Sequence, residues 1–229
     1  MNPVIIITRN NLELTKLCIE SVEAQTVNTS IHVFDNCSTD GTSEWLKQND
    51  RIVNHSTGYD LGVSAAWNLV LESVFGFWGE KHALVLNNDA IIPPWFYEEL
   101  LSYKEPFITG VAVDYQPWEK APRMPLVPHP DFSAYLITKS AWKSVGAFNA
   151  QMRLYCSDCD WHIRAHRAKV GAWKANVPYY HVNSQTMKRA EPEIRASIQA
   201  QANQDREVFQ SIYGCLPGSA DYERIFADA

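Results

Sequence analysis

Runs of apolar residues alternate with segments of mixed polarity along the first hundred residues. Continuous apolar runs are typical of strands buried on both faces, and we expect strands at residues 3–8, 30–36, 51–55 and 82–89. Apolar residues recur at helical spacing between these runs, and we expect helices at residues 10–25, 38–48, 62–75 and 93–103. Strands that alternate with helices form βαβ units, so the pattern predicts an α/β fold with a mostly parallel central sheet flanked by helices.

The pattern weakens between residues 106 and 131, where six prolines exclude a long helix. A strand at 107–115 and then a loop over the edge or mouth of the sheet are expected there. Later elements are expected as strands at 132–138 and 177–182 and as helices at 140–146, 159–170 and 192–214. Gly214 is predicted to end the last helix. The candidate helix caps are Thr42 or Ser43 and Ser140, and the helix at 93–103 is expected to carry proline in its first turn.

Polar residues follow three of the predicted strands directly. Thr8, Asp35 and Asp89 stand at those strand ends, and Asp89 belongs to the stretch "LVLNNDAIIPPWF" at 84–96. Parallel sheets bind ligands beyond the carboxyl ends of their strands, and buried polar groups are costly unless something binds them. The sequence therefore predicts a common crevice that contains these side chains.

Composition and charge narrow the class of protein. The 229 residues are 46% hydrophobic and 20% charged, which is typical of a globular chain of about one domain. The formal net charge of −6 argues against binding nucleic acid by phosphate neutralisation. The five cysteines are an odd number, which favours free thiols in a reducing compartment. No apolar run reaches the ~20 residues of a membrane span or has the flanks of a signal peptide, so we expect a soluble, cytoplasmic protein.

Four stretches, in a fixed order, carry a resemblance to a known family. They are "VIIITRNNLELTKLCIESVEAQT", "IHVFDNCSTDGTSEWL", "LVLNNDA" and "VGAFNAQMRLYCSDCDWHIRAHRA", followed by the tail "VPYYHVNSQT". Together they span roughly residues 4–186. Their order and spacing resemble the inverting family-two glycosyltransferases, which have the GT-A fold of nucleotide-diphospho-sugar transferases. Cys37 departs from the family pattern, which has a glycine at this position.

The resemblance implies a nucleotide-sugar site and a metal site. The implied nucleotide-sugar-binding residues are Thr8, Asp35, Gly62, Asn68, Asn87 and Asn88. Asp89 corresponds to the surviving carboxylate of a degenerate "DxD" motif, and His181 is implied as a second metal or diphosphate contact. The cofactor would be Mn²⁺ or Mg²⁺, since both prefer oxygen ligands and readily share them with substrate phosphates. Two alternatives stay open. The stretch "NNDA" would be only a polar turn that caps a helix, and His181 would have only a structural role.

The stretch "YCSDCDWHIR" resembles the family pattern "YxEDxDLxxR" and implies the general base. Asp158 takes that role, and Ser157 stands where the family usually has glutamate. A single displacement assisted by Asp158 would invert the anomeric configuration. The alternative is that Asp158 and Asp160 only favour a helix N-terminus through its dipole. Candidate acceptor contacts are Trp118, Ser157 and Trp161.

The implied organisation is a GT-A catalytic domain at 1–186, with a nucleotide-binding half at 1–105 and an acceptor half at 106–186. A helical extension would follow at 187–229. The implied enzyme is an inverting hexosyl- or pentosyltransferase that uses a nucleoside-diphosphate sugar, with UDP- or dTDP-sugars favoured on family grounds. Its acceptor would be a glycan or a lipid-linked sugar. A hydroxymethylated base in DNA is the alternative acceptor, against which the acidic charge weighs.

Other functions have weaker support in the sequence. A nucleotidyltransferase usually has a glycine-rich loop after its first strand, whereas this chain reads "TRNNLE" there. A nucleotide-sugar-binding pseudoenzyme is suggested by Ser157 and by the asparagines of "NNDA". The pair Cys156 and Cys159 lacks the second pair that a zinc site needs, and no glutamate stands beside His162 and His166 as a zinc-protease motif requires.

Overall fold

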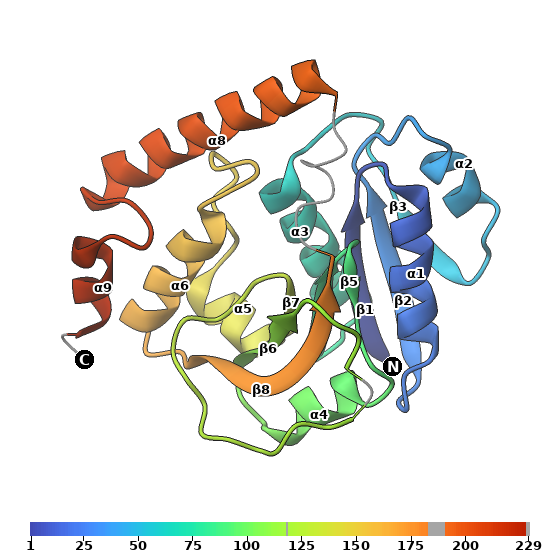
Figure 1. The fold of residues 1–229 in the computed structure, drawn as a ribbon, viewed down its shortest axis with the longest axis horizontal. Coiled ribbons are helices and arrows are strands. Elements are labelled where there is room, and N and C mark those ends of the chain that lie inside the picture. Colours follow the sequence, from blue (N-terminus) through green and yellow to red (C-terminus); the bar gives the residue numbers. More distant parts are fainter. Residues whose placement is uncertain (118, 183–190, 228–229) are drawn as a thin grey trace.

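The computed structural model describes residues 1–117, 119–182 and 191–227. Within them one eight-stranded sheet has the order β3-β2-β1-β4-β7-β6-β8-β5 (Figure 1). Its strands are β1 Asn2–Thr8, β2 Thr29–Asp35, β3 Ile52–His55, β4 His82–Asn87, β5 Ala90–Ile91, β6 Phe107–Val113, β7 Ala134–Thr138 and β8 Ala172–His181. The helices are α1 Leu12–Glu23, α2 Thr42–Lys47, α3 Val63–Glu72, α4 Phe96–Ser102, α5 Lys139–Val145, α6 Ser157–Arg167, α8 Pro192–Tyr213 and α9 Ala220–Ala227, with a π-helical turn η1 at Ser73–Phe77.

The first half of the sheet is parallel and brings the polar strand ends to one level. β1 pairs in parallel with β2 and β4, and β2 pairs in parallel with β3. In this register Thr8 lies opposite Asp35, and Ile7 lies opposite Asn87. The β6–β8 pair is also parallel, whereas β7 runs antiparallel to both of its neighbours and β5 runs antiparallel to β8. The predicted α/β fold with a mostly parallel central sheet is confirmed.

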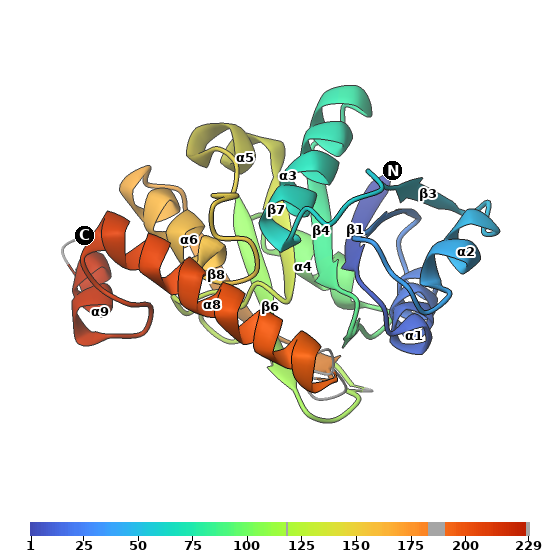
Figure 2. The same cartoon turned by 90° about the horizontal axis from the view of Figure 1, so that it is seen from above.

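Apolar side chains of β1 fill the core on both faces of the sheet. Val4 and Ile6 belong to a buried cluster with side chains of α1 and α4, and Ile5 and Ile7 belong to a second cluster with α3, α5 and α6. Successive side chains of a strand point to opposite faces, so a strand covered on both faces reads as a continuous apolar run. In Figure 2 α1 and α3 lie on opposite sides of β1.

Two of the expected helix caps are wrong. α2 begins after Gly41, which adopts a φ of 94°, rather than at Thr42 or Ser43 as the capping residue. The cap of α5 is Thr138, whose hydroxyl accepts the backbone N–H of Ala141 at 3.2 Å. Ser140 lies inside that helix and cannot cap it, because a capping residue needs a non-helical backbone, which Thr138 has at the end of β7.

Other element boundaries also differ from the prediction. α4 begins at Phe96, so Pro93 and Pro94 precede the helix instead of lying in its first turn. α6 begins at Ser157, two residues earlier than expected, and both Asp158 and Asp160 therefore lie in its first turn. The short strand β5 and the helix α9 were not predicted. β5 is defined by its pairing with β8, which local pattern does not reveal.

The C-terminal helices pack beside α6 (Figures 1 and 2). A third apolar cluster joins them to the rest of the chain, and its buried members are Met152, Cys156, Ile163, Phe209, Cys215 and Tyr222. α8 ends at Gly214 in the left-handed conformation, as the sequence predicts. No helix in the described residues combines the length and the apolar character needed to cross a membrane. All five cysteines are free thiols.

Candidate active site

A cavity of about 360 Å³ lies at the carboxyl ends of β1 and β4. Six of the residues singled out in the sequence line it: Thr8, Asn87, Asn88, Asp89, Asp158 and His181. They come from β1, from β4 and the turn after it, from the first turn of α6 and from the end of β8. Residues that are far apart in the sequence therefore meet in one crevice at the carboxyl end of the sheet, as predicted for Thr8 and Asp89 but not for Asp35, which does not line it.

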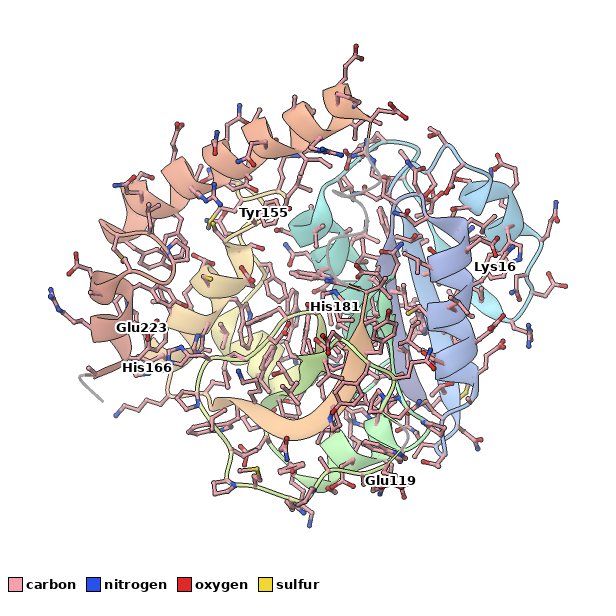
Figure 3. The ribbon with its side chains drawn as sticks, viewed as in Figure 1. Lys16, Glu119, Tyr155, His166, His181 and Glu223 are labelled. Atoms are coloured by element: carbon pink, nitrogen blue, oxygen red, sulfur yellow. The ribbon has the colours of Figure 1, made fainter. Side chains whose placement is uncertain are left out.

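Asp89 and His181 face each other across the β5–β8 pairing. Ala90 is the register partner of His181, and the N–H of Val182 donates to the carbonyl oxygen of Asp89 at 3.0 Å. This pairing brings His181 Nε2 to 3.1 Å from Asp89 Oδ1. Burial lowers the pKa of His181, but the hydrogen bond and charge of Asp89, with the charge of Asp131, outweigh it and raise the pKa overall. Figure 3 shows His181 near the middle of the molecule.

Asn88 holds the loop that follows β1. Its Nδ2 lies 3.1 Å from Thr8 Oγ1, 3.2 Å from Thr15 Oγ1 and 3.3 Å from the carbonyl oxygen of Asn10. The hydroxyls of Thr8 and Thr15 are themselves 2.8 Å apart. This network accounts for a polar residue directly after a buried strand: Asn88 satisfies the buried hydroxyls and fixes the loop that borders the cavity.

Asp35 is turned away from the cavity toward the loop between β2 and α2. Its carboxylate accepts the N–H of Ser38 at 3.0 Å and the hydroxyl of Ser43. The neighbouring Asn36 lines the cavity instead, and its Oδ1 accepts the N–H of Leu61 at 2.8 Å. Binding of a base or ribose by Asp35 stays a prediction. Cys37 has a φ of 64°, which explains why the related pattern has a glycine at this position.

Gly62 and Asn68 contact the loop between α5 and α6 and do not line the cavity. Asn68 donates from Nδ2 to the carbonyl oxygen of Phe148 at 2.8 Å and accepts the N–H of Phe148 at the same distance. Both ends of its amide are therefore engaged with backbone, which favours a structural role over the expected contact with the nucleotide-sugar. Gly62 has a φ of 77°, and a Cβ there would lie 2.8 Å from the carbonyl oxygen of Arg153.

Asp158 lines the cavity from the first turn of α6 and is partly buried. Its Oδ1 accepts the N–H of Cys159 at 2.9 Å. Burial raises the pKa of Asp158, two backbone N–H groups oppose that shift, and the charge of Asp131 adds to it. A carboxylate with a raised pKa is a stronger base than an ordinary aspartate, and this one faces open space in which a hydroxyl can lie.

The candidate acceptor contacts need correction. Trp161 is fully buried in the core, with its Nε1 donating to the carbonyl oxygen of Gly146 at 3.0 Å, so it offers no surface to an acceptor. Ser157 is also buried, and its Oγ lies 2.7 Å from the Oγ of Ser64, within hydrogen-bond distance. Trp118 lies outside the described residues, as does the part of the resembling tail beyond residue 182.

Arg9, Asp131 and Ile198 are among the residues of the cavity wall that were missed. Arg9 follows Thr8 directly and pairs through Nη1 with Asp60 Oδ2 at 2.6 Å, so its position after the first strand was an available signal. Asp131 lies in the proline-rich stretch just before β7, where the sequence pattern is weakest. Ile198 reaches the cavity from α8, and only tertiary packing shows this.

The pair Asp89 and His181 fits a divalent cation shared with a substrate. A carboxylate oxygen and an imidazole nitrogen are suitable ligands for Mn²⁺, and Mg²⁺ is commonly held by one or two carboxylates together with phosphate oxygens. No group of three or more His, Cys, Asp or Glu side chains within the described residues could hold a metal ion. The two side chains therefore suit an ion whose remaining ligands come from a diphosphate, and not a closed structural metal site.

Comparison of the fold with solved structures shows which architecture this is. Residues 1–349 of TarS from S. aureus match with a TM-score of 0.57 and 14% identity, over 100% of this chain and 79% of that one. The mannosyltransferase PcManGT from Pyrobaculum calidifontis, solved with GDP-Man and Mn²⁺, matches with a TM-score of 0.59 and 13% identity over 98% and 78%. Glucosyl-3-phosphoglycerate synthase from Mycobacterium tuberculosis, solved with Mg²⁺ and UDP, matches with a TM-score of 0.63 and 15% identity over 96% and 81%.

These identities establish the likeness of fold alone. A search of curated protein sequences finds no match to this chain. The family model described as "Glycosyl transferase family 2" matches residues 4–158, which covers the strand ends and reaches Asp158. The chain belongs to glycosyl transferase family 2 and has the GT-A fold, as the resemblance in its sequence predicts.

Proposed function

We propose that the protein is a metal-dependent inverting glycosyltransferase that moves a hexose or pentose from a nucleoside-diphosphate sugar to an acceptor hydroxyl. One observation carries this proposal: Asp89 and Asp158, which come from different halves of the chain, line the same cavity. Their joint position supports different roles for the two carboxylates, with Asp89 near the diphosphate and Asp158 near the acceptor. It also supports the proposed nucleotide-binding half at 1–105 and acceptor half at 106–186.

The donor is bound at the ends of β1 and β4. Thr8, Asn87 and Asn88 border the cavity there, and Arg9 supplies a cationic side chain beside them. Related folds were solved with UDP-GlcNAc in TarS, with GDP-Man in PcManGT and with UDP in the synthase. A UDP- or dTDP-sugar is the proposed donor, with the nucleotide lying over the β1–α1 loop.

Asp89 and His181 hold the cation in this proposal. Mn²⁺ or Mg²⁺ bound there would act as a Lewis acid that neutralises negative charge on the departing diphosphate. The protein contributes the geometry: the β5–β8 pairing fixes both side chains, and their burial restricts the access of water to them. Because both residues lie on paired backbone, their main chain is in place before a substrate arrives, and only the hydrogen bond between the two side chains would have to give way to the cation.

Asp158 accepts the proton of the acceptor hydroxyl. As the acceptor oxygen forms its bond to the anomeric carbon, the bond from that carbon to the diphosphate breaks on the opposite face of the sugar. The proton passes to the carboxylate of Asp158, and the anomeric configuration is inverted. General-base assistance of this kind contributes roughly 10²–10⁴-fold to a rate. The acceptor is proposed to be a glycan or a lipid-linked sugar, since an acidic cavity in a chain of charge −6 is unfavourable for polyanions such as DNA.

A binding experiment tests the role of Asp89. A panel of nucleotide-sugars is titrated calorimetrically into the wild-type protein and into Asp89→Ala, each with Mn²⁺ and with a chelator. We expect Mn²⁺-dependent binding to the wild type and a loss in Asp89→Ala that exceeds the roughly 10–100-fold typical of outer partners of a metal site. Asp114→Ala serves as a control, since it removes an exposed carboxylate.

Product analysis then separates an enzyme from a binding protein. The anomeric configuration of the transferred sugar, determined by NMR spectroscopy, should be opposite to that of the donor. Binding without transfer or hydrolysis of any donor would favour the nucleotide-sugar-binding pseudoenzyme. Transfer with retained configuration would refute the assignment of Asp158 as a general base.

A further inference from the structure

Asp205 of α8 is a fully buried carboxylate that collects four N–H donors. Its Oδ1 accepts the backbone N–H of Arg153 at 3.0 Å and the side-chain amide of Gln201 at 2.9 Å. Its Oδ2 accepts the backbone N–H groups of Leu154 at 2.8 Å and Tyr155 at 2.9 Å. Three consecutive backbone amides are thus held by one side chain, through charge-assisted hydrogen bonds that are stronger than neutral ones.

The backbone that Asp205 holds leads directly to Asp158. Beyond Tyr155, Cys156 adopts the left-handed conformation with a φ of 66° and serves as the cap of α6. Asp158 follows in the first turn of that helix. Leu154 and Tyr155 line the cavity together with Asp158, so the same short segment forms part of the cavity wall and carries the Asp158 carboxylate.

The opposite side of this segment rests on α3. The N–H of Val63 donates to the carbonyl oxygen of Arg153 at 2.7 Å, and the hydroxyl of Ser64 donates to the carbonyl oxygen of Met152 at 2.5 Å. The segment is therefore held by hydrogen bonds to its carbonyl oxygens on the α3 side and to its backbone amides on the α8 side. Removing either set leaves the segment held from one side alone.

We propose that Asp205 is a positioning residue for the transfer reaction: by holding the amides of residues 153–155 it fixes the start of α6 and thereby the place of the Asp158 carboxylate in the cavity. The inference rests on the proposed function, because it takes Asp158 as the base. It makes α8 part of the active site instead of an appended helix, and Ile198 in the cavity wall belongs to the same helix.

An amide cannot replace the carboxylate of Asp205. Each of the two oxygens accepts two donors. Asparagine has one oxygen, so in either orientation its NH₂ group would face at least one backbone N–H donor of residues 153–155 that it cannot accept. Asp205→Asn therefore changes almost no volume but releases part of the 153–155 backbone, and a misplacement of about 1 Å at a reacting group can cost on the order of 10²-fold in rate.

Tyr213 provides a matched control, which tests whether Asp205 only holds α8 against the rest of the chain. The hydroxyl of Tyr213, at the other end of the helix, donates to Asp160 Oδ1 at 2.8 Å. Tyr213→Phe therefore removes a contact between the same helix and the same α6, but leaves the amides of 153–155 bound. If Asp205 only docks the helix, the two substitutions should have similar effects on turnover.

The experiment measures kcat, donor affinity and amide hydrogen exchange for the wild type, Asp205→Asn and Tyr213→Phe. For Asp205→Asn we expect a kcat about 10–100-fold lower, a donor Kd within about threefold of the wild type, and faster exchange at residues 153–155. For Tyr213→Phe we expect a kcat within about threefold and unchanged exchange there. Asp205→Glu keeps both oxygens and should recover part of the lost kcat, and it replaces Asp205→Asn if that variant does not fold.

Several outcomes would overturn the inference. An unchanged kcat in Asp205→Asn, an equal loss in Tyr213→Phe, or a loss confined to donor affinity would each exclude positioning of the base. Failure of the proposed function looks different: the wild type itself would transfer or hydrolyse no nucleotide-sugar. The catalytic part of the inference would then fall with it, while the exchange data would still decide whether Asp205 holds the segment.

Discussion

At the scale of single residues, neighbours in the sequence have different tasks according to where their side chains point. Asn88 turns toward the β1–α1 loop and satisfies two hydroxyls, whereas Asp89 turns toward His181. Both were predicted as ligands on the basis of residue type. Their types and positions could be read from the sequence, but the direction of each side chain depends on strands that are more than seventy residues away.

Asp158 combines a cost to stability with a benefit to catalysis. Its pKa in the folded chain is raised by burial, so the folded state binds this proton more tightly than the unfolded state. The stability that the group contributes is present below its unfolded-state pKa and is lost as pH rises through the folded-state pKa. We expect Asp158→Asn to lower kcat by roughly 10²–10⁴-fold while the free energy of unfolding at pH 7 stays equal or increases. Urea denaturation checks this, and a less stable variant would contradict it.

The pH dependence of turnover follows from the same shift. The basic form of Asp158 is the active one, so kcat/KM should fall as pH decreases through a pKa above the ordinary aspartate value of 3.8. The residual activity of Asp158→Asn should lack this acidic limb. A pH–rate profile of both proteins, with the cation saturating throughout, provides the measurement. Persistence of the limb in the variant would assign it to another group.

At the scale of elements, the strands were more predictable than the ends of the helices. A strand of the parallel half is apolar throughout because both faces are covered, and this pattern is visible in the sequence alone. The start of a helix depends on single backbone angles, as Gly41 and Thr138 show. Three residues expected at the ligand instead belong to α3 or α6 and contact other parts of the chain: Asn68, Ser157 and Trp161.

The contact between α3 and the loop before α6 gives a test at this scale. Gly62 and Gly58 both have a φ of 77°, but a Cβ at Gly62 would lie 2.8 Å from the carbonyl oxygen of Arg153, whereas nothing lies within 4 Å of a Cβ at Gly58. Both alanine variants should lose roughly 1–3 kcal/mol because of the positive φ, and Gly62, with a ψ of 169°, lies in a region that is essentially confined to glycine. Gly62→Ala should lose more stability than that and also turnover, because the Arg153 segment must move. Equal losses of stability in urea and equal kcat in the two variants would show that the close approach is unimportant.

At the scale of the whole molecule, several contacts cross the proposed boundary between residues 1–186 and a helical extension at 187–229. Asp205 binds the 153–155 amides, Tyr213 binds Asp160, and Phe209 is buried beside Met152. Residues 191–227 therefore pack against the residues before them as part of the same structure. Sequence periodicity could predict α8 as a helix, but its partners are set by tertiary packing.

Two optical probes can show whether the chain unfolds as one unit. All eight tryptophans lie at or before Trp173, so fluorescence reports on the part of the chain that precedes α8, whereas far-UV circular dichroism includes the long helix α8. We expect the two urea transitions to coincide, because buried contacts tie α8 to the α6 segment. A dichroism change at lower urea than the fluorescence change would instead show an extension that unfolds by itself.

The first turns of α8 have a consequence for how the enzyme can diversify. Residues 191–200 are exposed apart from Ile198, which is partly buried and reaches the cavity, while the helix is anchored further along by Asp205 and Phe209. Substitutions in this stretch remove little packing and should be nearly neutral for folding. Changes in one turn of this helix should therefore alter the cavity wall at Ile198 while leaving the positions of Asp89 and Asp158 unchanged.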